Sequence, residues 1–129
     1  MGDPKSFKIA IVDDDASLCQ AMERLLRAAG YQSCSYLTAE AFLQNRGSVS
    51  PDCILLDIQL GGMSGFDLQR LLAASGTTTP VIFITAYDDP ETRKKALQTG
   101  CMAFLRKNDS SEAVLDAIRR ACSSRKVKA

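Results

Sequence analysis

The sequence contains no histidine, and no apolar run approaches the roughly 18 residues that a membrane-spanning helix requires. Without histidine, the chain has no Ser-His-Asp triad and no histidine metal site of its own. We expect no membrane contact. Residues 1–6 also lack the apolar stretch of a signal peptide, so we expect a short polar leader, although Met1-Gly2 with Ser6 also fits the loose myristoylation pattern.

The cysteines are few, widely spaced and odd in number, and no Cys-x-x-Cys motif occurs. This pattern argues against a disulfide framework or a cysteine zinc site. Free thiols are typical of a reducing compartment, so we expect a cytoplasmic protein. The five positions are Cys19, Cys34, Cys53, Cys101 and Cys122.

The net charge is only +1, which does not favour nucleic acid or a membrane surface as a partner. Basic residues do gather after Asp116, the last acid in the chain. We expect residues 123–129 to form a solvated basic tail; the alternative is a nucleic-acid arm, but no aromatic residues interleave with the charges. We therefore expect no nucleic-acid binding by this chain alone.

Short apolar runs alternate with stretches of helical periodicity along the whole sequence. Continuous apolar runs of this length are typical of strands that are buried on both faces of a parallel sheet. Five strand–helix units predict an α/β fold, a doubly wound five-stranded parallel sheet with helices on both faces, over residues 7–122. The expected strands are 7–12, 53–56, 81–84 and 102–105, with a weaker candidate at 33–37.

Capping residues mark the ends of the expected helices. Asp, Ser and Thr at a helix N-terminus accept hydrogen bonds from free backbone N–H groups, whereas glycine is favoured just past the C-terminus. The residues expected to begin helices are Asp15, Thr38, Asp89 before Pro90, and Asp109 with Glu112 three residues later. The residues expected to end helices are Gly30 and Gly100.

Polar side chains follow four of the apolar runs at the point where each expected strand ends. Asp13-Asp14 follow the first, Asp57 follows the run at 53–56, Thr85 follows the next, and Lys107 comes last. The carboxyl ends of parallel strands share one edge of the sheet, where ligands bind in open α/β folds. The sequence therefore predicts one site that combines acids, a hydroxyl and an ammonium group.

Clustered carboxylates repel one another, and a divalent cation relieves that repulsion. Oxygen ligands without histidine or cysteine indicate a hard ion, and Mg²⁺ prefers a few carboxylates plus water. With Mg²⁺ bound, Asp57 is placed to attack a phosphoryl group and form an aspartyl phosphate. Lys107 would neutralise the developing charge, and Thr85 would donate a hydrogen bond to a phosphoryl oxygen.

These residues resemble the receiver domain of bacterial two-component response regulators over nearly the whole chain. The matching segments are Ile11-Val12-Asp13-Asp14-Asp15, Leu55-Leu56-Asp57-Ile58-Gln59-Leu60, Met63-Ser64-Gly65, Ile84-Thr85-Ala86 and Phe104-Leu105-Arg106-Lys107. The resemblance is strongest to receivers that precede a helix-turn-helix DNA-binding domain. It implies the flavodoxin-like strand order 2-1-3-4-5.

The resemblance also implies a role for each site residue. Asp57 would be the phospho-acceptor, and Lys107 would contact the phosphate. Thr85 and Phe104 would be the switch pair. The implied Mg²⁺ ligands are Asp14, Asp57 and the backbone carbonyl of Gln59, with Asp13 acting through water.

The resemblance further implies a signalling switch rather than a conventional enzyme, because such a domain catalyses only its own phosphorylation and dephosphorylation. Its partner would be a sensor histidine kinase or a phosphotransfer protein. Phosphorylation would change the surface of the fourth helix, fifth strand and fifth helix, roughly Pro90–Cys122. That surface would signal to an output domain or partner, or form a phosphorylation-dependent homodimer.

Two positions differ from the family pattern. Gly61 stands four residues after the expected acceptor, where the family usually has proline, and Asn108 stands where a proline commonly follows the lysine. A cis bond before a residue other than proline costs roughly 2.5–4 kcal/mol. We therefore expect the Lys107–Asn108 bond to be trans.

Three other functions are compatible with parts of this pattern. A haloacid-dehalogenase-type phosphatase would have an aspartate at position 59, where this chain has Gln59. A flavin-binding electron carrier shares the fold, but the acids after the first strand would repel the flavin phosphate. A receiver that only docks would not require the complete set of acids with Thr85 and Lys107.

Overall fold

The computed structural model describes residues 7–45 and 50–127. Within them, strands and helices alternate along the chain. The strands are β1 Lys8–Val12, β2 Gln32–Tyr36, β3 Cys53–Asp57, β4 Val81–Thr85 and β5 Ala103–Arg106. The helices are α1 Ala16–Ala28, α2 Ala39–Asn45, α3 Gly65–Ala74, α4 Pro90–Gln98 and α5 Ser111–Val127.

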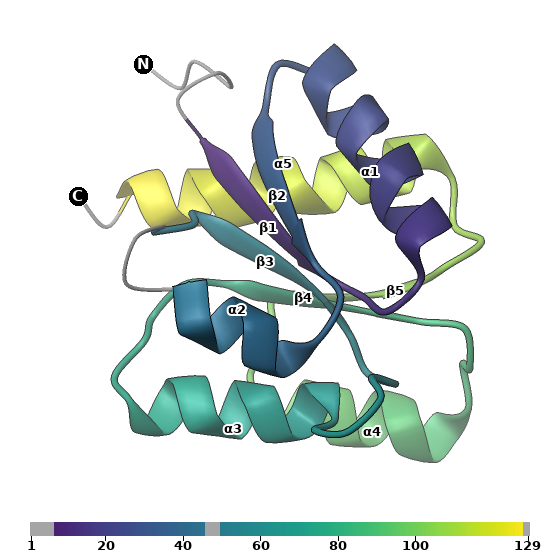
Figure 1. Ribbon diagram of the computed structural model, residues 1–129, viewed down its shortest axis with the longest axis vertical. Helices are drawn as coiled ribbons and strands as arrows, with labels where there is room; N and C mark the ends of the chain where they lie inside the picture. Colours follow the sequence, from purple (N-terminus) through teal and green to yellow (C-terminus); the bar gives the residue numbers. More distant parts are fainter. Residues whose placement is uncertain (1–6, 46–49, 128–129) are drawn as a thin grey trace.

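The five strands form one parallel sheet in the order β2-β1-β3-β4-β5. Helices α1 and α5 cover one face, and α2, α3 and α4 cover the other (Figure 1). This is the predicted doubly wound fold with its predicted strand order. The carboxyl ends of β1, β3, β4 and β5 therefore lie along one edge of the sheet.

The core consists of two apolar layers, one on each face of the sheet. Alternate residues of a strand point to opposite faces, so Ile9 and Ile11 of β1 lie in the layer under α1 and α5, whereas Ala10 and Val12 lie in the other. The three central strands β1, β3 and β4 are buried almost throughout. This burial fixes their register, because a slip of one residue would exchange the two faces.

Most of the predicted helix ends are confirmed. The Asp15 carboxylate accepts a hydrogen bond from Leu18 N at 3.2 Å, and Asp89 accepts one from Thr92 N at 2.8 Å. Gly30 and Gly100 follow their helices with positive φ angles of 95° and 78°, which an L side chain rarely adopts. Local capping chemistry thus defines where α1 and α4 begin and end.

The predicted start of the last helix is wrong. Ser110, not Asp109, caps α5, because its hydroxyl accepts a hydrogen bond from Ala113 N at 3.1 Å. The Asp109 carboxylate instead accepts a hydrogen bond from Arg106 N at 2.9 Å and pairs with the Arg106 guanidinium at 3.3 Å. Asp109 therefore ties the β5–α5 turn to the end of β5.

The C-terminal helix extends farther than expected, because α5 continues to Val127 and includes residues 123–127 of the segment expected to be a tail. The expected leader at 1–6 and residues 128–129 lie outside the described residues. No peptide bond among the described residues is cis, so Lys107–Asn108 is trans, as expected. None of the described helices has the length and apolar character that crossing a bilayer requires.

Gly65 brings the start of α3 directly onto the end of β3. A Cβ atom at this position would lie 2.3 Å from the Asp57 carbonyl oxygen and 2.8 Å from the Ile58 Cα. The Gly65 N–H donates a hydrogen bond to the Ile58 carbonyl at 2.9 Å. Only glycine permits this approach, which holds the β3–α3 loop against the site.

Candidate functional site

Two buried carboxylates and one ammonium group meet at the carboxyl edge of the sheet. Asp13 follows β1, Asp57 ends β3, and Lys107 follows β5. The Lys107 Nζ lies 3.1 Å from Asp57 Oδ2 and 3.1 Å from Asp13 Oδ2. Asp13 and Asp57 are each only 1% exposed. The structure therefore brings together three of the residues that the sequence predicted to share a site.

Backbone N–H groups orient both acids. The Gln59 N–H donates to Asp57 Oδ1 at 3.0 Å, and the Asp15 N–H donates to Asp13 Oδ1 at 2.9 Å. Among the described residues, Asp13 Oδ2 is buried and has no hydrogen-bond partner: Lys107 Nζ lies 3.1 Å away as an ion pair but donates its hydrogen bond to Asp13 Oδ1, at 3.3 Å. One carboxylate oxygen in the pocket is therefore incompletely satisfied.

The pocket changes the acid–base properties of its residues. The pKa of Asp57 is raised from 3.8 to about 6, chiefly because the carboxylate is buried. The hydrogen bond from the Gln59 N–H and the nearby Lys107 lower this pKa, whereas the negative charge of Asp13 raises it further. Burial would lower the pKa of Lys107, but the hydrogen bond and charge of Asp57 and of Asp13 outweigh it and the pKa is raised. At pH 7 Lys107 is charged and most Asp57 is ionised.

The acids fit a hard divalent cation. Asp13, Asp14 and Asp57 each offer a carboxylate oxygen, and these oxygens lie within 4.8 Å of one another. Asp14 is exposed, so its oxygen is open to the solvent side of the pocket. An unsatisfied buried oxygen beside two further carboxylates is a donor set that suits Mg²⁺.

Thr85 ends β4 at the same edge of the sheet, but its side chain makes a hydrogen bond within the β4–α4 loop rather than with the acids. It is fully buried, and its Oγ1 accepts a hydrogen bond from Tyr87 N at 3.0 Å. In the β4–β5 register, Thr85 pairs with Arg106 and Phe83 pairs with Phe104, so Thr85 and Phe104 are diagonal neighbours. Phe104 is partly buried in the layer beneath α4.

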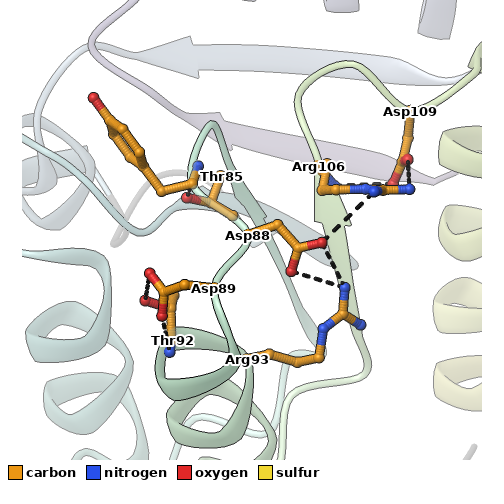
Figure 2. A network of polar contacts seen from close by, with 8 residues as sticks. Thr85, Asp88, Asp89, Thr92, Arg93, Arg106 and Asp109 are labelled. Atoms are coloured by element: carbon orange, nitrogen blue, oxygen red, sulfur yellow. Dashed lines mark hydrogen bonds and ion pairs between the residues drawn. The ribbon is translucent and has the colours of Figure 1, made fainter.

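An ionic network beside Thr85 was not predicted. The Asp88 carboxylate accepts hydrogen bonds from Arg93 Nη2 at 2.9 and 3.0 Å and lies 3.6 Å from Arg106 Nη1 (Figure 2). The guanidinium carbon of Arg93 lies 4.9 Å from the centroid of the Phe104 ring. The network therefore joins the β4–α4 loop, α4 and β5.

An open cleft leads to the acids. It is lined by Asp14 and Gln59 on one side and by Glu91, Thr92 and Lys95 of α4 on the other. The Gln59 side chain is exposed beside it. The cleft provides a route by which a second molecule can reach the pocket from solvent.

Comparison with known proteins identifies the family. The sequence matches the model of the response regulator receiver domain over residues 9–119. The response regulator protein TmoT of Ectopseudomonas mendocina is 38% identical over 94% of this chain and 54% of that protein. The transcriptional regulatory protein TdiR of Thauera aromatica is 31% identical over 88% of this chain and 50% of that protein.

Solved structures agree. The response regulator StyR is 34% identical with a TM-score of 0.86, and the match covers 94% of this chain and 61% of StyR. FixJ-N is 28% identical with a TM-score of 0.85, and the match covers 95% of this chain and 96% of FixJ-N. The chain spans about half the length of the curated relatives it matches. These relatives are regulators, not phosphatases or flavin carriers, and the chain belongs to the response regulator receiver domain family.

Proposed function

We propose that this receiver domain carries a phosphoryl group on Asp57. The observation that supports this most directly is the setting of the Asp57 carboxylate, which is buried, held by the Gln59 N–H at 3.0 Å and paired with Lys107 at 3.1 Å. A structural acid at a strand end does not require a partly buried ammonium partner and two acidic neighbours. The same arrangement suits a nucleophile whose product is a dianionic phosphoryl group.

The reaction is a displacement at phosphorus. An Asp57 carboxylate oxygen forms a bond to the phosphorus, and the bond from phosphorus to the donor's leaving group breaks. The leaving group keeps that electron pair: the imidazole nitrogen of a phosphohistidine takes up a proton, whereas the carboxylate of an acyl phosphate departs as the anion. The donor is a phosphohistidine of a sensor histidine kinase or phosphotransfer protein, or a small phosphodonor entering through the cleft beside Glu91 and Lys95.

Asp14, Asp57 and the Gln59 carbonyl would hold Mg²⁺ directly, and Asp13 would hold it through water. The bound ion supplies neutralisation of the charge on the phosphoryl oxygens. Lys107 contributes a second positive charge, because its ammonium can turn from the carboxylates to a phosphoryl oxygen.

Thr85 would report the phosphoryl group to the surface. Its hydroxyl now accepts a hydrogen bond from Tyr87 N and would move to donate to a phosphoryl oxygen. Phe104 then shifts inward, and the surface of α4, β5 and α5 changes. That surface would signal to an output domain or partner, or form a phosphorylation-dependent homodimer. We propose that DNA binding is a property of an output domain and not of this chain alone.

Intact mass after incubation with acetyl phosphate and Mg²⁺ tests this function. We expect one added phosphoryl group on the wild type and none on Asp57→Asn, because an amide is a poor nucleophile. Asp116→Asn, an exposed acid on α5, is the matched control and should be labelled normally. Chelation of Mg²⁺ should stop labelling. Equal labelling of Asp57→Asn, or an unlabelled wild type, would contradict the proposal, and the latter would favour a docking-only receiver.

A further inference from the structure

Asp88 occupies a central position between the switch residue and the output surface. It lies three residues after Thr85, in the β4–α4 loop, and its side chain is 25% exposed. Its two carboxylate oxygens face the guanidinium groups of Arg93 on α4 and Arg106 on β5 (Figure 2). A single acid therefore connects three segments that the switch would have to move relative to one another.

The Arg93 side chain has two partners at once. Its Nη2 donates to both Asp88 oxygens, at 2.9 and 3.0 Å, and its guanidinium carbon lies 4.9 Å from the centroid of the Phe104 ring. A guanidinium over an aromatic face is attractive, and Asp88 fixes where that guanidinium stands. Phe104 is consequently covered by a cation whose position depends on Asp88.

Arg106 provides the second arm. It lies on the same face of the sheet as Phe104, two residues away on β5, and its guanidinium contacts Asp88 at 3.6 Å and Asp109 at 3.3 Å. Arg106 is also the strand partner of Thr85. The loop that holds Asp88 is therefore tied to the strand that carries Phe104.

We infer that Asp88, Arg93 and Arg106 form an ionic latch that holds Phe104 beneath the Arg93 guanidinium until the loop after Thr85 moves. The link to the loop is the hydrogen bond from Tyr87 N to Thr85 Oγ1 at 3.0 Å, one residue before Asp88. Reorientation of the Thr85 hydroxyl breaks that bond and releases the loop. The Asp88 contacts then loosen, Arg93 leaves the ring, and Phe104 is free to shift. This regulatory role rests on the proposed function of Asp57 and Thr85.

The latch predicts that the resting state is sensitive to single charges and to salt. Losing Asp88 removes two partly exposed ion pairs, and a pair of this kind shifts an equilibrium by about 1.4-fold to fivefold, so released Phe104 should be favoured by roughly twofold to thirtyfold. Because beryllofluoride with Mg²⁺, a phosphoryl mimic, would bind the released state, its apparent affinity should rise by up to the same factor. If apolar packing alone held Phe104 in place, removing Asp88 would change neither the Phe104 equilibrium nor the beryllofluoride affinity.

Fluorine NMR of protein labelled with fluorophenylalanine tests the latch in the absence of any phosphodonor. The chain has five phenylalanines, and Phe104→Leu identifies the signal of interest. We expect Asp88→Asn to move the Phe104 signal in the same direction as Arg93→Gln, and raising salt to about 1 M to move the wild type that way. Asp116→Asn removes comparable exposed pairs on α5 and should leave the signal and the beryllofluoride affinity unchanged.

Two results would overturn the latch: a Phe104 signal that is identical in wild type and Asp88→Asn at low salt, or, where the wild type binds beryllofluoride, an affinity that Asp88→Asn leaves unchanged. Failure of the proposed function is read separately. A wild type that gains no phosphoryl mass while Asp88→Asn still moves Phe104 rejects the phospho-acceptor role and retains the latch. A wild type that is labelled while Phe104 ignores Asp88 rejects the latch alone.

Discussion

Two charged clusters lie on either side of Thr85, and they differ mainly in burial. In the acid pocket, the side chains of Asp13 and Asp57 are 1% and 2% exposed, and they share one Lys107 ammonium. In the latch, Asp88 is 25% exposed and its two arginine partners are about half exposed. Both clusters pair carboxylates with cations at similar distances, so their interaction energies differ mainly because their side chains are exposed to solvent to different degrees.

Burial makes the pocket costly and the latch adjustable. Buried charges interact strongly and lose much when one partner is removed, whereas exposed pairs contribute little and are screened by salt. The pocket is thus suited to capturing a highly charged group, and the latch is suited to a small, reversible bias. Thr85 joins them, because it lies beside Asp57's strand and accepts a hydrogen bond from the Asp88 loop.

Replacing Lys107 should have the largest effect on stability. Lys107→Gln leaves the buried Asp13 and Asp57 carboxylates without their partly exposed ammonium partner, and leaving buried charge uncompensated costs about 3 kcal/mol. Urea unfolding at pH 7 without divalent ions measures the loss. Mg²⁺ should restore part of it, because the ion replaces the missing positive charge. Lys94→Gln, on exposed α4, is the control; equal losses in the two variants would contradict the comparison.

Replacing Asp57 should instead stabilise the protein at neutral pH. The folded-state pKa of Asp57 is raised from 3.8 to about 6, so its ionised form costs stability above pH 6. One pKa unit corresponds to about 1.4 kcal/mol, so Asp57→Asn should be more stable than wild type by up to about 3 kcal/mol near pH 7.5.

The pH profile of that difference is the test. As the pH falls from about 6 toward 3.8, the wild type recovers the penalty and the two proteins should converge, measured by urea unfolding without divalent ions. Adding Mg²⁺ at neutral pH should narrow the gap, since only the wild type offers the third carboxylate. A gap that stays constant across this range would show that burial of the Asp57 charge is not its cause.

The fold was predictable because its signals are local or periodic. The apolar runs around Ile9, Leu55 and Phe83 are buried on both faces and read clearly as central strands. The edge strand β2 is only partly buried, so its sequence carried a weaker signal. The start of α5 was misplaced by one residue because Asp109 had a better partner in Arg106, which local capping rules do not consider.

The site was predictable only in part. Parallel strand ends must meet, so the proximity of Asp13, Asp57 and Lys107 followed from the fold class. The Asp88 network did not, because Asp88 and Arg93 are five residues apart across a helix start and Arg106 belongs to another strand. The one signal in the sequence was Arg106, an exposed arginine two residues after Phe104 at the end of β5, where it can pair with a nearby carboxylate.

The smallest expected effects separate the two arms of the latch. Arg93→Gln removes two short hydrogen bonds to Asp88 and the contact with Phe104, so we expect a loss of about 1 kcal/mol. Arg106→Gln removes only the 3.6 Å contact with Asp88 and the 3.3 Å contact with Asp109, and the Asp109 bond to the Arg106 backbone N–H survives. Its loss should be a few tenths, roughly 0.2–0.5 kcal/mol.

The dependence on salt distinguishes the stability losses of the two arginine variants from the loss caused by Lys107→Gln in the pocket. Urea unfolding at about 0.05 M and about 1 M NaCl should show both arginine effects shrinking at high salt, because exposed charges are screened within a few ångströms there. The Lys107→Gln loss should change little, since its carboxylate partners are shielded from solvent. If Arg106→Gln proved more damaging than Arg93→Gln, the Asp88–Arg106 contact would be the stronger arm. Phe104 would then be held chiefly through its own strand, and the Arg93 guanidinium would only cover it.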